Sequence, residues 1–565
     1  MKHSKEMKER SLSLSTTILG SRTRFIRITF LVLISFVFLA CNRKNNIESI
    51  VNTEAADLSD FYDSIFVMYE LIPIDSLEVE PFFTKYPAVK KYEKDLTSIY
   101  QDHNFSHVWF DQKGVVIYGN SLYAKVKDIE SEGIFSTFPY QEKIDSIFKR
   151  DISDTTILPE EEFLLTCLYL FYFDVVYKGI DDNLSNFGWL LPRKKLSYTA
   201  MLDSIISDKK LQNENSLNLF GQYYKLRNVL KRYRTIEQNG GWLPIELEPD
   251  KKVYQPNDSS AVIQQIRERL YITGEIKENN KSAIYDEDLL AGIQQFQLHN
   301  GYQPDSIISQ KHIAALNIPV EDYIKKIIVN MERCRWVPPQ ISKAKEFIFV
   351  NIPAFHLDMY RDGKVEFESA VVVGSELNKT VIFDGMMTYI VFSPYWNIPK
   401  SIIRNEVLPG MEKDENYLSK RNMDWNDGNV RQRPGRNNSL GLVKFIFPNS
   451  NNIYLHDSPA KSLFEKEDRA KSHGCIRVAK AREMALKILE DDEDWPVTKI
   501  DAAMKAGKEK TCVLKNEIPV YIGYFTAWVD IEGQINFYKD VYKRDERLAE
   551  ILIINNTHKG ENKEK

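Results

Sequence analysis

The sequence predicts a multidomain α+β protein with a helical amino-terminal half and a β-rich carboxy-terminal part. Apolar residues repeat at helical spacing over much of residues 57–240, as in the long run that follows three glutamates at Glu160. Residues 345–545 instead alternate apolar and polar residues around turn sequences, which is typical of strands joined in hairpins. The chain of 565 residues has room for about three or four domains.

The first forty residues are predicted to direct export rather than to fold. Basic residues precede the apolar run ITFLVLISFVFLA, which is shorter than the about 20 residues of a membrane span. The run ends at Ala40-Cys41 and resembles a bacterial lipoprotein signal, with Phe38 where leucine is usual. The resemblance implies a signal peptide at 1–40 and a lipidated Cys41. An uncleaved anchor is the alternative. Both place the protein in the cell envelope, membrane-anchored and facing the periplasm.

A polar tether at 41–56 leads to a helical scaffold at 57–240, in which no chemistry is visible. After a linker rich in glycine and proline, residues 256–318 predict two amphipathic helices, a loop and a third short helix. The stretches IRERLYITGEI, GIQQFQLHNGYQPD and ISQKHIAAL resemble the small three-helix peptidoglycan-binding module. The resemblance implies contact with glycan or stem peptide. The alternative is an ordinary helical bundle, packed by Leu270, Ile293, Phe296 and Leu316.

Residues 345–545 are predicted to form one β-rich domain. Its first hairpin turns at RDGK, further strands lie in MTYIVFSPYWNIP and GLVKFIFPNSNNIYLHDSP, and two more flank IEGQ. A helical insert at about 400–428 interrupts the strands, and a helix follows at AKAREMALKILED. Residues 546–565 form a carboxy-terminal tail whose last residues should fray.

Charge and cysteine content exclude some functions. The formal net charge is −5, which argues against a nucleic-acid binder that neutralises phosphates. The spacing of the five cysteines shows no CxxC pair and specifies no disulfide. Cys167 and Cys512 stand in apolar segments and are interpreted as core residues.

The sequence SHGC, Ser472 to Cys475, carries the candidate chemistry, with His456 upstream at a strand end. A thiol is mostly protonated near neutral pH, so a nucleophilic cysteine needs a basic partner. His456 could supply it as an imidazolium, and the helix expected after the motif would also favour a thiolate. Gly474 leaves room for backbone N–H groups beside a developing oxyanion. The alternatives are an inert core cysteine and a zinc site of His456, His473, Cys475 and Asp457.

The stretch HDSPAKSLFEKEDRAKSHGCIRV resembles the signature of L,D-transpeptidases, and TYIVFSPYWNIPKSI and VYIGYFTAWVD resemble their large, multidomain branch. The resemblance implies that Cys475 is the nucleophile and His456 the proton acceptor and donor. It implies that the backbone carbonyl of Asp457 orients His456, that His473 shapes the pocket and that the insert caps the groove. Arg477 stands where shorter family members have asparagine, so its role is open.

The resemblance also implies the reaction. Cys475 would attack the third residue of a tetrapeptide stem, D-alanine would leave, and an amine of another stem would take the thioester. Neither metal nor cofactor is implied. Water as acceptor would make a carboxypeptidase, and a non-catalytic wall-binding lipoprotein is a further alternative. The oligomeric state is left open.

The substrate-binding residues that we expect come from three places. RQRPGRNN offers cations that could meet stem carboxylates, or it is a solvated loop. Aromatic residues of the strand before the insert, Tyr389 among them, could line the groove or belong to the core. Ser472 of the SHGC motif and Arg477, which follows it, are the remaining residues. The expected set is Ser472, Arg477, Tyr395, Trp396, Arg431, Arg433 and Asn437.

Overall fold

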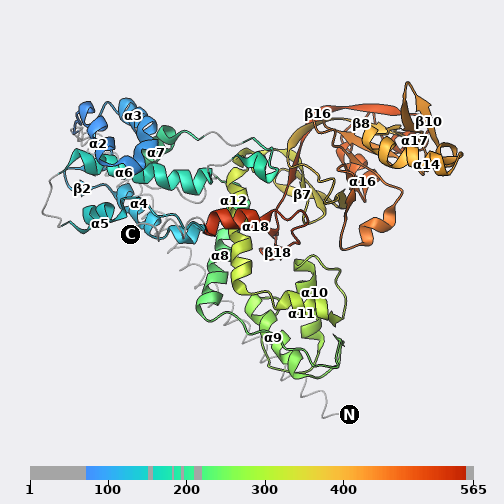
Figure 1. Cartoon of the computed structure of the whole chain (residues 1–565), viewed down its shortest axis with the longest axis horizontal. Coiled ribbons are helices and arrows are strands. Elements are labelled where there is room, and N and C mark those ends of the chain that lie inside the picture. The colour runs from blue at the N-terminus through green and yellow to red at the C-terminus, as the bar shows by residue number, and fades with distance from the viewer. Residues whose placement is uncertain (1–71, 151–156, 181–182, 193–195, 209–218, 555–565) are drawn as a thin grey trace, which may run out of the picture. The chain divides into compact units, whose positions relative to one another are not determined.

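The structure is a computed structural model that describes residues 72–150, 157–180, 183–192, 196–208 and 219–554 (Figure 1). The predicted signal peptide, the tether, Cys41, the first residues of the scaffold and the end of the tail lie outside these residues. Among the residues described, no helix has the length and apolar character to cross a membrane.

The scaffold is helical, as predicted, and α6 lies at its centre. Almost every side chain of α6 is buried, including Glu162, whose carboxylate accepts the backbone N–H groups of Val108 and Trp109. These bonds, together with the Tyr100 hydroxyl, satisfy a carboxylate that burial would otherwise penalise. The helices are α2 (Val79–Lys85), α3 (Glu93–Asp102), α4 (Ile117–Lys127), α5 (Gln141–Lys149), α6 (Pro159–Phe173), α7 (Tyr198–Asp208) and α8 (Gly221–Gln238).

The three helices predicted at 256–318 are present as α9 (Ala261–Thr273), α10 (Glu287–His299) and α11 (Gln310–Leu316). Ser260 and Asp286 cap the first two helices by accepting backbone N–H groups of the first turn. The helices enclose a core of their own, which contains the predicted Leu270, Ile293, Phe296 and Leu316. The helix order is therefore confirmed, and binding of peptidoglycan by this module stays a prediction.

Helix α12 (Val320–Trp336) was not predicted, because it carries many charged residues that turn out to be buried. Glu332 accepts hydrogen bonds from the Ile180 N–H and the Trp336 indole, both at 2.7 Å, and pairs with Arg335 at 2.9 Å. The Arg335 guanidinium also donates to the Glu132 carbonyl at 2.6 Å. A buried pair with all these partners is satisfied, and it fixes α12 against the scaffold.

The carboxy-terminal domain is built on a nine-stranded sheet in the order β14-β7-β15-β13-β12-β8-β16-β5-β6. β6 pairs with β7 as well, so the sheet closes on itself through eight of its strands. The predicted hairpins at RDGK and IEGQ are both present. The strands are β5 (Glu346–Asn351), β6 (His356–Arg361), β7 (Lys364–Gly374), β8 (Asp384–Phe392), β12 (Val443–Ile446), β13 (Leu455–His456), β14 (Ala470–Ser472), β15 (Ile476–Val478), β16 (Lys510–Gly523), and, outside this sheet, β17 (Ala527–Val529) and β18 (Ile535–Phe537).

The predicted helical insert is only partly helical. It begins with α13 (Lys400–Ile402), α14 (Leu408–Lys413) and α15 (Tyr417–Lys420), but then forms a hairpin. The hairpin turns at Asp427-Gly428, both with positive φ, which is the Asp-Gly turn that joins strands tightly. We call residues 396–432 the cap; it has a small core of its own at Ile398, Ile402, Val407 and Val430. Its strands are β9 (Trp396–Asn397), β10 (Met423–Asn426) and β11 (Asn429–Gln432).

Candidate active site

The SHGC motif lies between two strands, not before a helix as the sequence suggested. Ser472 ends β14, Cys475 immediately precedes β15, and the next helix, α16, begins only at Ala481. β13 and β15 are parallel neighbours, with His456 opposite Arg477. This pairing brings His456 and the motif together. The helix that follows the motif, α16, begins six residues after Cys475, so the expected helix N-terminus does not stand next to the thiol.

A cavity of about 460 Å³ lies between the cap and the sheet. Six of the predicted site residues line it: Trp396, Asn437, His456, His473, Cys475 and Arg477. Sequence reasoning missed several residues that also line it, among them Glu406, Arg421 and Tyr454. The predicted residues absent from its lining are Asp457, Ser472, Gly474, Tyr389, Tyr395, Arg431 and Arg433.

His456 is buried, and its Nδ1 atom lies 2.5 Å from the backbone carbonyl oxygen of Asp457. A carbonyl only accepts hydrogen bonds, so this contact assigns the ring hydrogen to Nδ1 and leaves the lone pair on Nε2. Burial, helped by the positive charge of Arg477, lowers the pKa of His456 to about 4. The ring is therefore neutral near pH 7 and can accept a proton at Nε2.

Cys475 is a protonated thiol at rest. Burial raises its pKa, although hydrogen bonding by Tyr454 and the charge of Arg477 act in the opposite direction. Its Sγ atom lies 3.6 Å from the carbonyl oxygen of Asn452, which accepts the S–H. Burial in the cavity desolvates both groups and so favours their neutral forms over the imidazolium–thiolate pair that the sequence suggested.

Ser472 organises the loop instead of lining the cavity. Its buried hydroxyl donates to the Cys475 carbonyl at 2.6 Å and accepts the Gly474 N–H at 3.1 Å. The Gly474 N–H is therefore engaged within the loop. Gly474 has φ of +116°, a conformation that favours glycine, and Thr380 donates to its carbonyl at 2.8 Å. Ser472 and Thr380 are positioning residues for Cys475.

The cations expected to meet substrate carboxylates are already paired. Arg431 and Arg433 both bind Asp424, at 3.1 and 3.2 Å, and the Arg431 guanidinium covers the Tyr395 ring. Since β10 places Asp424 beside them, these side chains hold the hairpin of the cap. Arg477 and Arg421 are the arginines that line the cavity.

Some of the missed residues have a signal in the sequence and others do not. Tyr454 stands two residues before His456, and alternation along a strand puts both on one face; their rings lie 5.7 Å apart. Glu406 and Arg421 come from the cap, where no local pattern marks them. Glu406 binds His473, with Oε1 2.9 Å from Nε2.

The alternative zinc site is not assembled. The Asp457 carboxylate, its suggested fourth ligand, instead binds Lys461 at 2.8 Å and the Leu442 N–H at 3.0 Å. The other cysteines of the described residues, Cys167, Cys334 and Cys512, are free and buried, which confirms the two predicted as core. Among the four described cysteines, Cys475 has the most accessible thiol.

Comparison with known proteins supports the sequence interpretation. Residues 345–504 match the L,D-transpeptidase catalytic domain family, YkuD, and residues 94–230 match a scaffold domain family. A Haemophilus influenzae protein, provisionally named an L,D-transpeptidase, is 34% identical over 250 residues. The alignment covers 40% of this chain and 50% of that relative, so the chain spans about half of its length.

Solved structures give a weaker comparison. An L,D-transpeptidase of Stackebrandtia nassauensis is 13% identical, with 48% of this chain and 98% of that chain covered and a TM-score of 0.21. An L,D-transpeptidase fragment of Xylanimonas cellulosilytica is 13% identical, with coverages of 49% and 100% and a TM-score of 0.17. Such TM-scores carry no argument, so the assignment rests on the sequence matches. Residues 345–504 of this chain are an L,D-transpeptidase catalytic domain of the YkuD family.

Proposed function

We propose that this protein crosslinks peptidoglycan stem peptides through a thioester on Cys475. The observation that carries the proposal is the cavity under the cap, which Cys475 and a neutral His456 line together. The match of residues 345–504 to the L,D-transpeptidase catalytic domain supports the same reaction.

In the first half of the reaction, His456 Nε2 takes the thiol proton as Sγ attacks the carbonyl carbon of the third stem residue. The carbon becomes tetrahedral, and its oxygen carries the negative charge. The C–N bond to D-alanine then breaks, and the imidazolium returns the proton to the leaving amine. His456 can both accept and return this proton at Nε2. The hydrogen bond from Nδ1–H to the Asp457 carbonyl holds the ring in one orientation, with Nε2 on the far side of the ring from that carbonyl.

In the second half, the side-chain amine of another stem attacks the thioester and loses a proton to His456. The C–S bond breaks, the crosslink forms and Cys475 recovers its proton. Arg477 and Arg421 give the cavity two positive groups, which would attract the carboxylates of the stems. Glu406 and His473, which contact each other, also line the cavity.

The partners of this function are peptidoglycan and a membrane. Residues 256–318 would hold the protein on the wall, and a lipidated Cys41 would hold it on a membrane facing the periplasm. Metabolic lipid labelling of the wild type and Cys41→Ser tests the second point. Unchanged labelling and membrane fractionation in the variant would identify the segment as an uncleaved anchor.

The acceptor separates the two enzymatic candidates. Purified tetrapeptide-containing muropeptides are incubated with the full chain, and the products are identified by mass spectrometry. Dimers support the transpeptidase, tripeptides alone support a carboxypeptidase, and unchanged substrate supports a wall-binding protein. Cys475→Ala is expected to leave the substrate unchanged, and crosslinking by this variant would refute the assignment to this site.

A further inference from the structure

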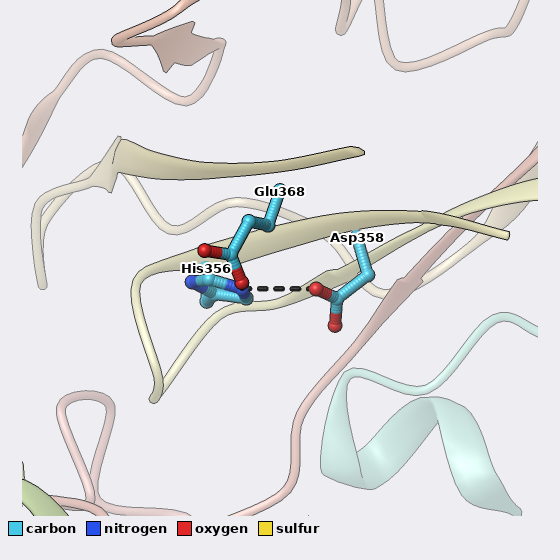
Figure 2. Close-up of side chains that lie close together, drawn as sticks. All are labelled: His356, Asp358 and Glu368. Carbon is cyan, nitrogen blue, oxygen red and sulfur yellow. Dashed lines mark hydrogen bonds and ion pairs between the residues drawn. The ribbon is translucent and has the colours of Figure 1, made fainter. Parts of the chain in front are cut away.

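A second group of reactive side chains lies on the hairpin of β6 and β7, apart from the cavity under the cap. His356 and Asp358 are two residues apart on β6, so both point to one face of the sheet. Glu368 lies directly opposite Asp358 in the antiparallel register and points to the same face. Figure 2 shows the three side chains converging on that face.

The distances suit a small cation. His356 Nε2 lies 2.9 Å from Asp358 Oδ1 and 3.9 Å from Glu368 Oε2, and all three ligand atoms lie within 4.8 Å of one another. Zinc bonds to histidine nitrogen and carboxylate oxygen are about 2.0–2.2 Å long, so two ligands at tetrahedral angles lie about 3.4 Å apart. The two contacts of Nε2 bracket this value, and modest rotations would seat an ion among the three atoms.

The charges of the group also favour a cation. Two carboxylates face one imidazole, which leaves an excess negative charge whenever the imidazole is neutral. The side chains of His356, Asp358 and Glu368 are 38%, 19% and 65% exposed, so water can reach the group and complete the coordination. Arg469 is a nearby positive charge, and Tyr538 is near enough to Asp358 to feel its charge.

We propose that His356, Asp358 and Glu368 bind one divalent transition-metal ion of the zinc type. One imidazole with two carboxylates is a ligand set that zinc accepts, with water at the remaining position. The pair of β6 with β7 is the seam at which the sheet closes, and the ion would join its two strands. β7 continues beside β14 and β15, which flank the SHGC motif, so the ion would also stiffen the support of the active site.

The competing interpretation is a proton in place of the metal. Burial lowers the pKa of His356, but the hydrogen bond to Asp358 and the charges of both carboxylates raise it overall, while Arg469 opposes them. An imidazolium clamped by two carboxylates would need no ion. A metal ion must displace this proton from the imidazole, so the ion pair and the metal site exclude each other.

The test is zinc binding to the full chain without a histidine tag, measured by competition with a chromogenic chelator and by the zinc content after dialysis. All variants carry Cys475→Ala, which removes zinc binding by the active-site thiol. We expect one zinc ion per chain. His356→Gln and Asp358→Asn should each weaken the affinity by about tenfold or more. Asp362→Asn, at the exposed tip of the same hairpin, makes the same charge change outside the group and should leave the affinity unchanged.

Thermal unfolding supplies a second measurement. Zinc should raise the unfolding midpoint of the Cys475→Ala parent and of Asp362→Asn, and raise it little in Asp358→Asn. X-ray absorption of the zinc-loaded parent should show nitrogen and oxygen ligands without sulfur. Failure of the parent to retain zinc would overturn the proposal and favour the ion pair. Equal zinc affinity in the parent and both ligand variants would overturn it as well.

Discussion

Glu406 of the cap and His473 of the SHGC loop meet across the cavity, with Oε1 2.9 Å from Nε2. His473 stands two residues before the proposed nucleophile, Cys475, and Glu406 lies in the middle of the cap. Each is 51% exposed, so solvent screening keeps the contribution of the pair to folding small, about 0–1 kcal/mol. We expect the contact instead to position the cap over Cys475.

Glu406→Gln should therefore affect substrate binding more than stability. The amide keeps the shape of the side chain but replaces the carboxylate that contacts His473, so the cap is held less firmly. We expect KM for soluble stem peptides to rise several-fold and the unfolding midpoint to stay nearly unchanged. Glu412→Gln, an exposed position on α14, is the matched control. Equal kinetics of the two variants would show that the contact does not position the cap.

Ser472→Ala should lower both stability and turnover. The variant deletes the hydroxyl that bonds the Cys475 carbonyl and the Gly474 N–H, and it leaves these groups without that partner. Losing a buried hydrogen-bond partner costs about 1–3 kcal/mol of unfolding free energy. Urea unfolding measures this loss, and kcat on stem peptides measures the displacement of Cys475. A variant with wild-type stability and kcat would refute the positioning role.

Gly474→Ala should reduce activity for a conformational reason. A Cβ atom at this position meets only the Asn378 carbonyl, at 3.9 Å, so space is available. The φ of +116° is the obstacle, and holding alanine there costs about 1–3 kcal/mol. Gly428→Ala in the hairpin of the cap, where φ is +75° and the space is open, is the control. Both variants should lose stability, but Gly474→Ala alone should lose most of its kcat.

Cys475 and His456 could be predicted because the motif that carries them is local in the sequence. Their protonation could not, because it depends on burial and on Arg477, which the register of β13 and β15 places opposite His456. The partner of His473 could not be predicted either, since Glu406 comes from a distant segment and no periodicity points to it. The pairing of Arg431 and Arg433 with Asp424 could not be predicted either, because Asp424 becomes their neighbour only once the hairpin forms.

The fold likewise has elements with a local sequence signal and elements without one. The scaffold helix α6 and the helices of 256–318 were predictable from apolar spacing and caps. α12 was not, because the charges of Glu332 and Arg335 hide its burial in the sequence. The hairpin of the cap had a usable signal, the Asp-Gly pair at 427–428, which the helical pattern before it obscured.

Arg477→Gln should raise the pKa of His456 and the pKa of Cys475. The charge of Arg477 lowers the pKa of His456 and the pKa of Cys475, so its removal raises both. In the wild type, His456 is protonated only as the pH falls through about 4, and kcat/KM should decline there. In the variant this acid limb should move upward, toward the ordinary histidine value of about 6.5.

The titration of the Cys475 thiol is measured by iodoacetamide labelling at a series of pH values, with the labelled peptide quantified by mass spectrometry. Because burial raises the thiol pKa, wild-type Cys475 should label with a midpoint above the ordinary value of about 8.5. Arg477→Gln should move this midpoint higher still, while Arg433→Gln, whose charge is paired with Asp424 outside the cavity, should leave both titrations in place. His456→Ala should label much like the wild type, because a neutral ring lends no charge to the thiol, yet it should lose most of its turnover. A labelling midpoint near neutral pH in the wild type that His456→Ala moves upward would instead establish an imidazolium–thiolate pair, and the general-base step proposed for His456 would be wrong.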